Sequence, residues 1–179
     1  MVGEHTVSSL LAGSLDRKLY TRFEDTIVPT SNGTTQIDHI VVSAFGIFVI
    51  ETKNVAGWIF GRENDAKWTQ VLFGKKWRFQ NLLRQNYRHT RALAEFLMLG
   101  HSVFHSIVFF IGNCEFKTPM PRRVMNSGLS SYIHKFQSRC MDDVTVANIV
   151  RALRSLKVNP ALTRQLHVAS LGSAIGTNL

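Results

Sequence analysis

Residues 36–53 read Gln-Ile-Asp-His-Ile-Val-Val-Ser-Ala-Phe-Gly-Ile-Phe-Val-Ile-Glu-Thr-Lys, and this stretch decides the fold. Two apolar runs rich in β-branched residues flank a short turn, a pattern that predicts a hairpin of two buried strands. With a loop of two or four residues, Val42 lies opposite Ile47. The same register then places Asp38 opposite Glu51.

These two carboxylates make the hairpin a candidate metal site. Directly paired strand residues have Cβ atoms about 4.5–5.5 Å apart, close enough for both carboxylates to bind one cation. Lys53 follows on the same face of its strand as Glu51. Like charges that face each other destabilise a sheet, so a purely structural hairpin would rarely keep this pair. The alternative is that Glu51 and Lys53 only mark the exposed end of a strand, because Glu-x-Lys is a common sequence.

Asp38, followed after the hairpin by Glu51-Thr52-Lys53, resembles the active-site motif of the PD-(D/E)XK nuclease superfamily. Within that superfamily, residues 3–112 are similar to the nuclease-related domain (NERD) family. The segments that carry this second resemblance are Gly3-Glu4, Gln36-Ile37-Asp38-His39, Ile50-Glu51-Thr52-Lys53-Asn54, Gly57 and Gln85-Asn86.

The resemblance implies an α/β fold with a restriction-endonuclease-like αβββαβ core, in which helices flank a mixed sheet. Residues 1–112 would form this nuclease core with a β insert, and 113–179 a C-terminal helical extension packed on the same domain. A chain of 179 residues is long enough for one such domain. Helices are expected over 4–20, 81–99 and 144–156, and further strands over 26–29, 57–61, 67–73, 76–79 and 103–112. The tail after Pro160 is expected to be partly disordered.

The resemblance also implies a metal-dependent nuclease that hydrolyses phosphodiester bonds in DNA, in DNA processing or in defence against foreign DNA. Asp38, Glu51 and the backbone carbonyl of Thr52 would hold Mg²⁺, for which Mn²⁺ could substitute. Lys53 would orient the nucleophile or stabilise charge at the phosphate. The alternative, from another functional class, is a catalytically silent DNA-binding module of the same fold.

Two further catalytic candidates come from the resemblance. In the superfamily a glutamate on the first helix commonly completes the metal site, and Glu4 occupies that place in this sequence. An acid at a helix N-terminus is also a favourable partner of the helix dipole, which is the structural alternative. Gln85 matches a glutamine that the family places near the active site, where it could orient water or a phosphate.

The charge balance favours a polyanionic partner such as DNA, since 21 Lys and Arg stand against 12 Asp and Glu, a net charge of +9. Arg84, Arg88 and Arg91 fall at helical spacing i, i+4 and i+7, which predicts a basic stripe. Such a stripe is either a solvated face or a row of contacts to a nucleic-acid backbone.

Aromatic and basic residues alternate in the predicted β insert. Trp58, Trp68 and Trp77 are interleaved with cations that include Lys75 and Lys76. This pattern suits a surface that tracks phosphates and stacks on bases, but tryptophans on small sheets are more often part of a core. Lys75 and Lys76 are therefore predicted to bind nucleic acid, together with the arginine stripe.

The remaining features limit where the protein acts. The first residues do not resemble a signal peptide, and the longest apolar run, around 107–111, is too short to span a membrane. Cys114 and Cys140 lack Cys-x-x-Cys spacing, which argues against a zinc ribbon or a disulfide framework. We therefore expect a cytoplasmic protein without a membrane partner. Cleavage of two strands would favour a homodimer.

Overall fold

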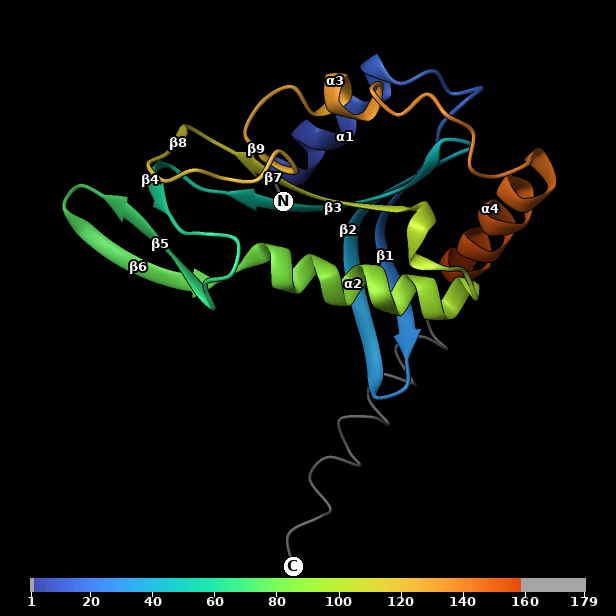
Figure 1. The fold of residues 1–179 in the computed structure, drawn as a ribbon, viewed down its shortest axis with the longest axis horizontal. Helices are drawn as coiled ribbons and strands as arrows, with labels where there is room; N and C mark the ends of the chain where they lie inside the picture. The colour runs from blue at the N-terminus through green and yellow to red at the C-terminus, as the bar shows by residue number, and fades with distance from the viewer. Residues whose placement is uncertain (1, 159–179) are drawn as a thin grey trace, which may run out of the picture.

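The computed structural model describes residues 2–158, and the side chains of residues 6–156. It shows an α/β fold with two mixed sheets flanked by helices, as predicted (Figure 1). The helices are α1 (Val2–Ser14), α2 (Leu82–Leu97), the short 3-10 helix η1 (His101–Val103), α3 (Leu129–Ile133) and α4 (Asp143–Val158). The strands are β1 (Thr21–Thr30), β2 (Gly33–Ser43), β3 (Gly46–Asn54), β4 (Gly57–Phe60), β5 (Lys67–Leu72), β6 (Lys75–Gln80), β7 (Phe104–Ile111), β8 (Cys114–Phe116) and β9 (Val124–Met125).

The main sheet has the strand order β1-β2-β3-β7-β9. Its first three strands are antiparallel neighbours, while β7 and β9 join in parallel. The predicted hairpin is confirmed: Ser43 pairs with Gly46 around a two-residue loop, and Val42 lies opposite Ile47. Gly46 has φ +141°, and a Cβ there would lie 2.5 Å from the Nε2 atom of His105, so no larger residue fits this corner.

Helices cover both faces of the main sheet (Figure 1). On one face, side chains such as Ile40 and Val49 pack against α2 and α4 through Leu93 and Leu153. On the other face, the intervening residues pack against α1 and α3; they include Val41, Phe48 and Ile50. Because successive strand residues point to opposite faces, a strand buried on both faces is apolar throughout. This explains the unbroken apolar runs in the central hairpin.

The β insert forms a second sheet of order β6-β5-β4-β8, in which β8 is parallel to β4. Ile59 and Trp68 are fully buried and pack one face of this sheet against Phe110 of the main sheet. Asn81 joins the insert to α2: its Oδ1 accepts a hydrogen bond from the N–H of Leu83, and its Nδ2 donates to two carbonyls of the insert, those of Glu63 and Asp65.

Residues after 112 contribute to every layer, since they add β8 to the small sheet, β9 to the main sheet and α4 to the face covered by α2. The N–H groups of Cys140 and Met141 both donate to the carbonyl of Ala44 in the hairpin loop, which anchors the segment that leads into α4. The prediction for the tail after Pro160 lies outside the described residues. None of the helices within residues 2–158 combines the length and hydropathy that a bilayer crossing requires.

Two elements differ from the sequence prediction. Helix α1 ends at Ser14 instead of residue 20, and Leu19, expected in its inward stripe, is exposed. The strand predicted over 26–29 is the ten-residue β1, which pairs with β2 along almost its whole length. Its polar residues hide this extent in the sequence, because they lie on a strand at the edge of the sheet.

Asp142 caps the N-terminus of α4, because its Oδ1 accepts a hydrogen bond of 2.7 Å from the N–H of Thr145. Hydrogen bonds from the hydroxyl and N–H groups of Thr145 lower the pKa of the Asp142 carboxyl below its usual range. The cap therefore stabilises the fold fully above the ordinary aspartate pKa, and this stabilisation is lost as the pH falls through the lowered pKa.

Asp142→Ala is accordingly expected to lower the melting temperature by a few degrees at neutral pH. The difference from the wild type should shrink toward strongly acidic pH, as followed by circular dichroism. Asp143→Ala, one residue further on, is the matched control and should cost less, because Asp143 pairs with Arg139 at an exposed position. A difference that grows as the pH falls would contradict the cap assignment.

Candidate active site

The candidate site centres on Glu51, which lies near the end of β3 and is only 5% exposed. Helix α2 supplies two groups to its carboxylate. The amide Nε2 of Gln85 donates a hydrogen bond of 2.7 Å to Oε1, and Nδ1 of His89 lies 3.2 Å from Oε2. Gln85 and His89 are four residues apart, so they share one face of the helix. The predicted neighbourhood of Gln85 and Glu51 is thus present in the structure.

Asn86 fixes the helix that carries these two groups. It is fully buried, and its Nδ2 lies within hydrogen-bonding distance of the Val49 carbonyl at 2.9 Å, the Ser106 hydroxyl at 3.0 Å and the Ile107 carbonyl at 2.8 Å. These acceptors belong to β3 and β7. One amide therefore ties α2 to both strands and sets the rotation that directs Gln85 and His89 at Glu51.

The Asp38 carboxylate is held by the residue next to Glu51. Its Oδ2 accepts hydrogen bonds from the N–H and from the hydroxyl of Thr52, each 2.8 Å long. The last paired residues of β2 and β3 are His39 and Ile50. If the same register continued by one residue, Asp38 would lie opposite Glu51, as predicted. Asp38 thus reaches across to Thr52 just where the ladder between the two strands stops.

The sheet is also irregular on the other side of Asp38. Pairing between β1 and β2 skips the position of Asp25, whose backbone has φ +48°, in the left-handed region. Non-glycine residues rarely adopt this conformation, although aspartate does so more often than most. Asp25 itself accepts a hydrogen bond from Gln36. The strand that carries Asp38 is therefore released from regular pairing on both sides at this point, as is common near functional sites.

Lys53 lies two residues beyond Glu51 on β3 and is half-buried. Its ammonium Nζ lies 5.7 Å from the centre of the Phe79 ring, close enough for a cation–π contact. Phe79 belongs to β6, so the insert provides a wall against which the lysine rests. The ammonium group of Lys53 thus lies between the main sheet and the insert.

The described residues fit a hard divalent cation such as Mg²⁺. Oε2 of Glu51 is buried, and among the described residues it accepts no hydrogen bond, although Nδ1 of His89 lies 3.2 Å away. An extended residue directs its N–H and C=O to the same side, which places the Thr52 carbonyl on the side of Asp38. Within residues 6–156, no three His, Cys, Asp or Glu side chains form a metal cluster. Mg²⁺ nevertheless commonly takes only one or two carboxylates and completes its shell with water and substrate phosphates.

The other predicted residues are Glu4, the arginine stripe and the two lysines of β6. The side chain of Glu4 lies outside the described residues, so its role stays a prediction. Arg84, Arg88 and Arg91 are exposed along α2, as the stripe predicts, but Arg84 donates to the Asn64 carbonyl and Arg91 pairs with Glu95.

Lys75 and Lys76 are neighbours on β6, so their side chains leave opposite faces of the small sheet. Both are exposed. The sequence pattern predicts both as contacts to nucleic acid, and the strand geometry allows only one of them on any single face of this sheet.

His89 is a candidate site residue that the sequence motifs do not reveal, because its Nδ1 lies 3.2 Å from Oε2 of Glu51. The signal that could have found it is its spacing of four residues from Gln85 on an amphipathic helix, which places both on one face. The double hydrogen bond of Thr52 to Asp38 is likewise not apparent from the motif, which gives Thr52 a role through its carbonyl alone.

Two comparisons relate the chain to known proteins. An uncharacterized protein of Bacillus anthracis is 45% identical over 116 residues, which cover 64% of this chain and 54% of the relative. The chain thus spans about half the length of the curated relative that it matches. The model of the nuclease-related domain family matches residues 1–111, the part that contains α1, the central hairpin, the insert, α2 and β7. Because that match covers more than half of the sequence, the chain belongs to the nuclease-related domain (NERD) family.

Proposed function

We propose that this protein is a metal-dependent nuclease that hydrolyses phosphodiester bonds in DNA. The observation that carries the proposal is the Glu51 carboxylate, buried against Gln85 and His89, beside Thr52, which holds Asp38. Burial of a carboxylate is costly unless a cation or donors compensate it, and Oε2 of Glu51 accepts no hydrogen bond from the residues that the structure describes. Family membership supports a nuclease-related role.

In this proposal, Asp38, Glu51 and the Thr52 carbonyl hold the cation. A bound Mg²⁺ or Mn²⁺ would supply Lewis-acid polarisation of a phosphoryl oxygen and a water of lowered pKa. Gln85, fixed through its bond to Glu51, orients that carboxylate. Lys53 stabilises the negative charge that develops on the phosphate, because its ammonium is held at the edge of the site by Phe79.

DNA is the proposed substrate because the chain carries a net charge of +9 and exposes cations on the helix that borders the site. Arg88 is exposed on α2 three residues after Gln85, so both lie on the same side of the helix, and a backbone phosphate at Arg88 would lie on the side of the proposed site. The role in DNA processing or defence, the cytoplasmic location and the homodimer remain predictions from the sequence.

The metal requirement gives the first test of this function. Purified protein should cleave plasmid, linear or single-stranded DNA when Mg²⁺ or Mn²⁺ is present, and EDTA should abolish that cleavage. Products resolved on gels would distinguish nicking from end-directed degradation. Restoration of cleavage by added Mg²⁺ after EDTA would exclude irreversible damage to the protein.

The alternative function, a silent DNA-binding module, predicts a different outcome in the same experiment. It predicts that no product forms with either metal, while binding remains and weakens steeply as salt increases. That result would replace the proposed nuclease by a binding protein of the same fold.

A further inference from the structure

We propose that the solvent-facing side of the small sheet binds single-stranded DNA. We define the open face as Trp58, Phe60, Thr69, Val71, Lys76 and Arg78. The inference deepens the proposed function and rests on it in one respect: it makes unpaired DNA part of the substrate on which the nuclease acts.

The strand register places these six residues on one face. Trp58 pairs with Val71, which pairs with Lys76. Phe60 pairs in the same way with Thr69, and Thr69 with Arg78. Directly paired residues share a face, so the open face consists of two parallel rows, each running from an aromatic ring on β4 to a cation on β6.

The opposite face of the same sheet is the one that joins the core. Trp68 is fully buried there, stacks on Phe110 with ring centres 6.0 Å apart, and donates from its indole N–H to the Arg62 carbonyl. Trp58, by contrast, is 50% exposed. Trp68 is therefore a core residue that cannot stack on a base, whereas Trp58 remains available to do so.

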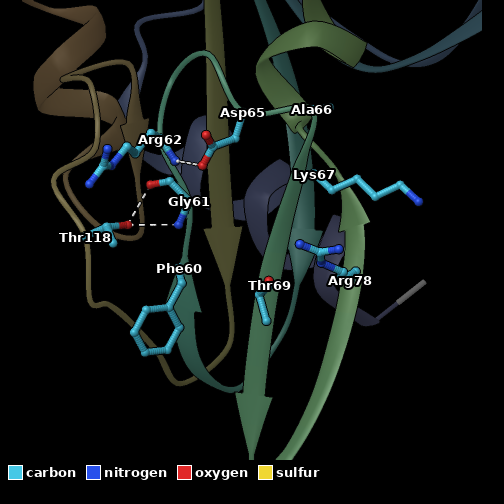
Figure 2. A pocket seen from close by; sticks show the side chains of 9 residues that line it. All are labelled: Phe60, Gly61, Arg62, Asp65, Ala66, Lys67, Thr69, Arg78 and Thr118. Carbon is cyan, nitrogen blue, oxygen red and sulfur yellow. Dashed lines mark hydrogen bonds between the residues drawn. The ribbon is translucent and has the colours of Figure 1, made fainter.

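The open face is hollowed in two places. One hollow of about 700 Å³ is lined by all six residues of the open face. A second, of about 510 Å³, shares Phe60, Thr69 and Arg78 with the first (Figure 2). Neither hollow is lined by Asp38, Glu51 or Lys53, so this surface is separate from the catalytic groups.

Figure 2 shows how the second hollow is built. Phe60, Thr69 and Arg78 lie next to one another on three adjacent strands. The Thr118 hydroxyl closes one side by bonding the backbone of Gly61 at both its N–H and its carbonyl.

The charge around the hollows identifies the partner. The side chains that line them include four cations and one acid: Arg62, Lys67, Lys76, Arg78 and Asp65. Lys117 adds a further cation, whose Nζ lies 4.8 Å from the centre of the Trp58 ring, although it also pairs with Glu115. Cations that follow a row of exposed aromatic rings are the combination by which proteins bind single strands: the cations track phosphates and the rings stack on bases. Duplex bases are already stacked on each other, so exposed rings favour unpaired DNA.

The test is the affinity for a fluorescent oligo(dT), measured by anisotropy on the full chain in EDTA. All variants carry Glu51→Gln, so that cleavage plays no part and the result is independent of whether the protein is a nuclease. Trp58→Ala is expected to weaken binding about tenfold, since stacking of a base on an aromatic side chain contributes on the order of 1–3 kcal/mol. Lys76→Glu with Arg78→Glu should also reduce the slope of log K against log[salt] by about 1.4, or roughly 0.7 for each phosphate that the protein no longer neutralises.

Matched controls lie elsewhere on the molecule. Trp77→Ala removes a ring that is 46% exposed but belongs to the opposite face of the same sheet. Arg151→Glu with Arg154→Glu makes the same change in net charge on α4, which Figure 1 shows at the far end of the molecule from the β5–β6 hairpin. Both controls should bind oligo(dT) like the parent, and thermal melting of each variant verifies folding.

Four outcomes would overturn the proposal. Trp58→Ala could bind oligo(dT) as well as the parent, or Trp77→Ala could weaken binding as much as Trp58→Ala does. Trp58→Ala could also weaken binding to a duplex of the same length equally, which would mean that the surface contacts only phosphates. Binding of the open face to vesicles with phosphatidylserine in place of oligo(dT) would assign it to a membrane instead.

Discussion

Glu51→Gln is expected to lower metal-dependent DNA cleavage by about 10²–10³-fold, the usual cost of removing one group that stabilises charge in a reaction. The substitution is isosteric, so residue 51 can still accept the hydrogen bond from Gln85 that Oε1 accepts now. It removes the negative charge that the proposed cation requires. Initial rates on plasmid DNA with saturating Mg²⁺ would measure the effect.

The matched control is Glu95→Gln, which makes the same change at an exposed position later on α2, where Glu95 pairs with Arg91. It should cleave at the wild-type rate. Asp38→Asn and Lys53→Ala should lower cleavage as Glu51→Gln does, with melting temperatures near that of the wild type. Wild-type cleavage by Glu51→Gln would refute the assignment of the catalytic site.

Trp68→Ala is expected to lower the free energy of unfolding by about 3–5 kcal/mol, the range for removal of a large aromatic side chain from a core. Trp68 is fully buried, packs against Phe79 and Phe110, and satisfies its indole N–H with the Arg62 carbonyl. Its removal would leave a cavity between the insert and the main sheet. Urea denaturation followed by circular dichroism would measure the change.

Trp77→Ala is the control for this experiment, because it removes the same side chain from an exposed position of the same sheet. We expect it to cost about 1 kcal/mol, near the centre of the distribution for point mutations. Trp68→Phe should fall between the two, since it keeps one ring in the core but loses the hydrogen bond. Equal losses for Trp68→Ala and Trp77→Ala would contradict the division of these residues between core and surface.

Helix α2 illustrates how far the sequence could predict the candidate site. Its existence follows from the periodicity of its apolar residues, and Gln85 could be assigned to the site through resemblance to a family. The contact between His89 and Glu51 could not, because it depends on how the helix is rotated about its axis against β3. That rotation is set by Asn86, whose three acceptors come from strands 37, 20 and 21 residues away in the chain.

The insert shows the same limit in a different way. The sequence indicates short strands with alternating aromatic and basic residues, but periodicity alone does not say which face of such a sheet meets the core. The burial of Trp68 and the exposure of Trp58 follow from docking of the insert onto Phe110. The same alternating sequence would also be compatible with burial of Trp58 and exposure of Trp68.

By itself, the sequence determined the central hairpin, its register and its family, because these depend on residues close together in the chain. Two apolar runs joined by a tight turn specify which residues face each other, and Gly46 permits the close approach of His105. Only the tertiary structure decided which groups surround Glu51 and which face of the insert is open to solvent. Those contacts join segments that are distant in sequence, and their geometry is set by packing between elements.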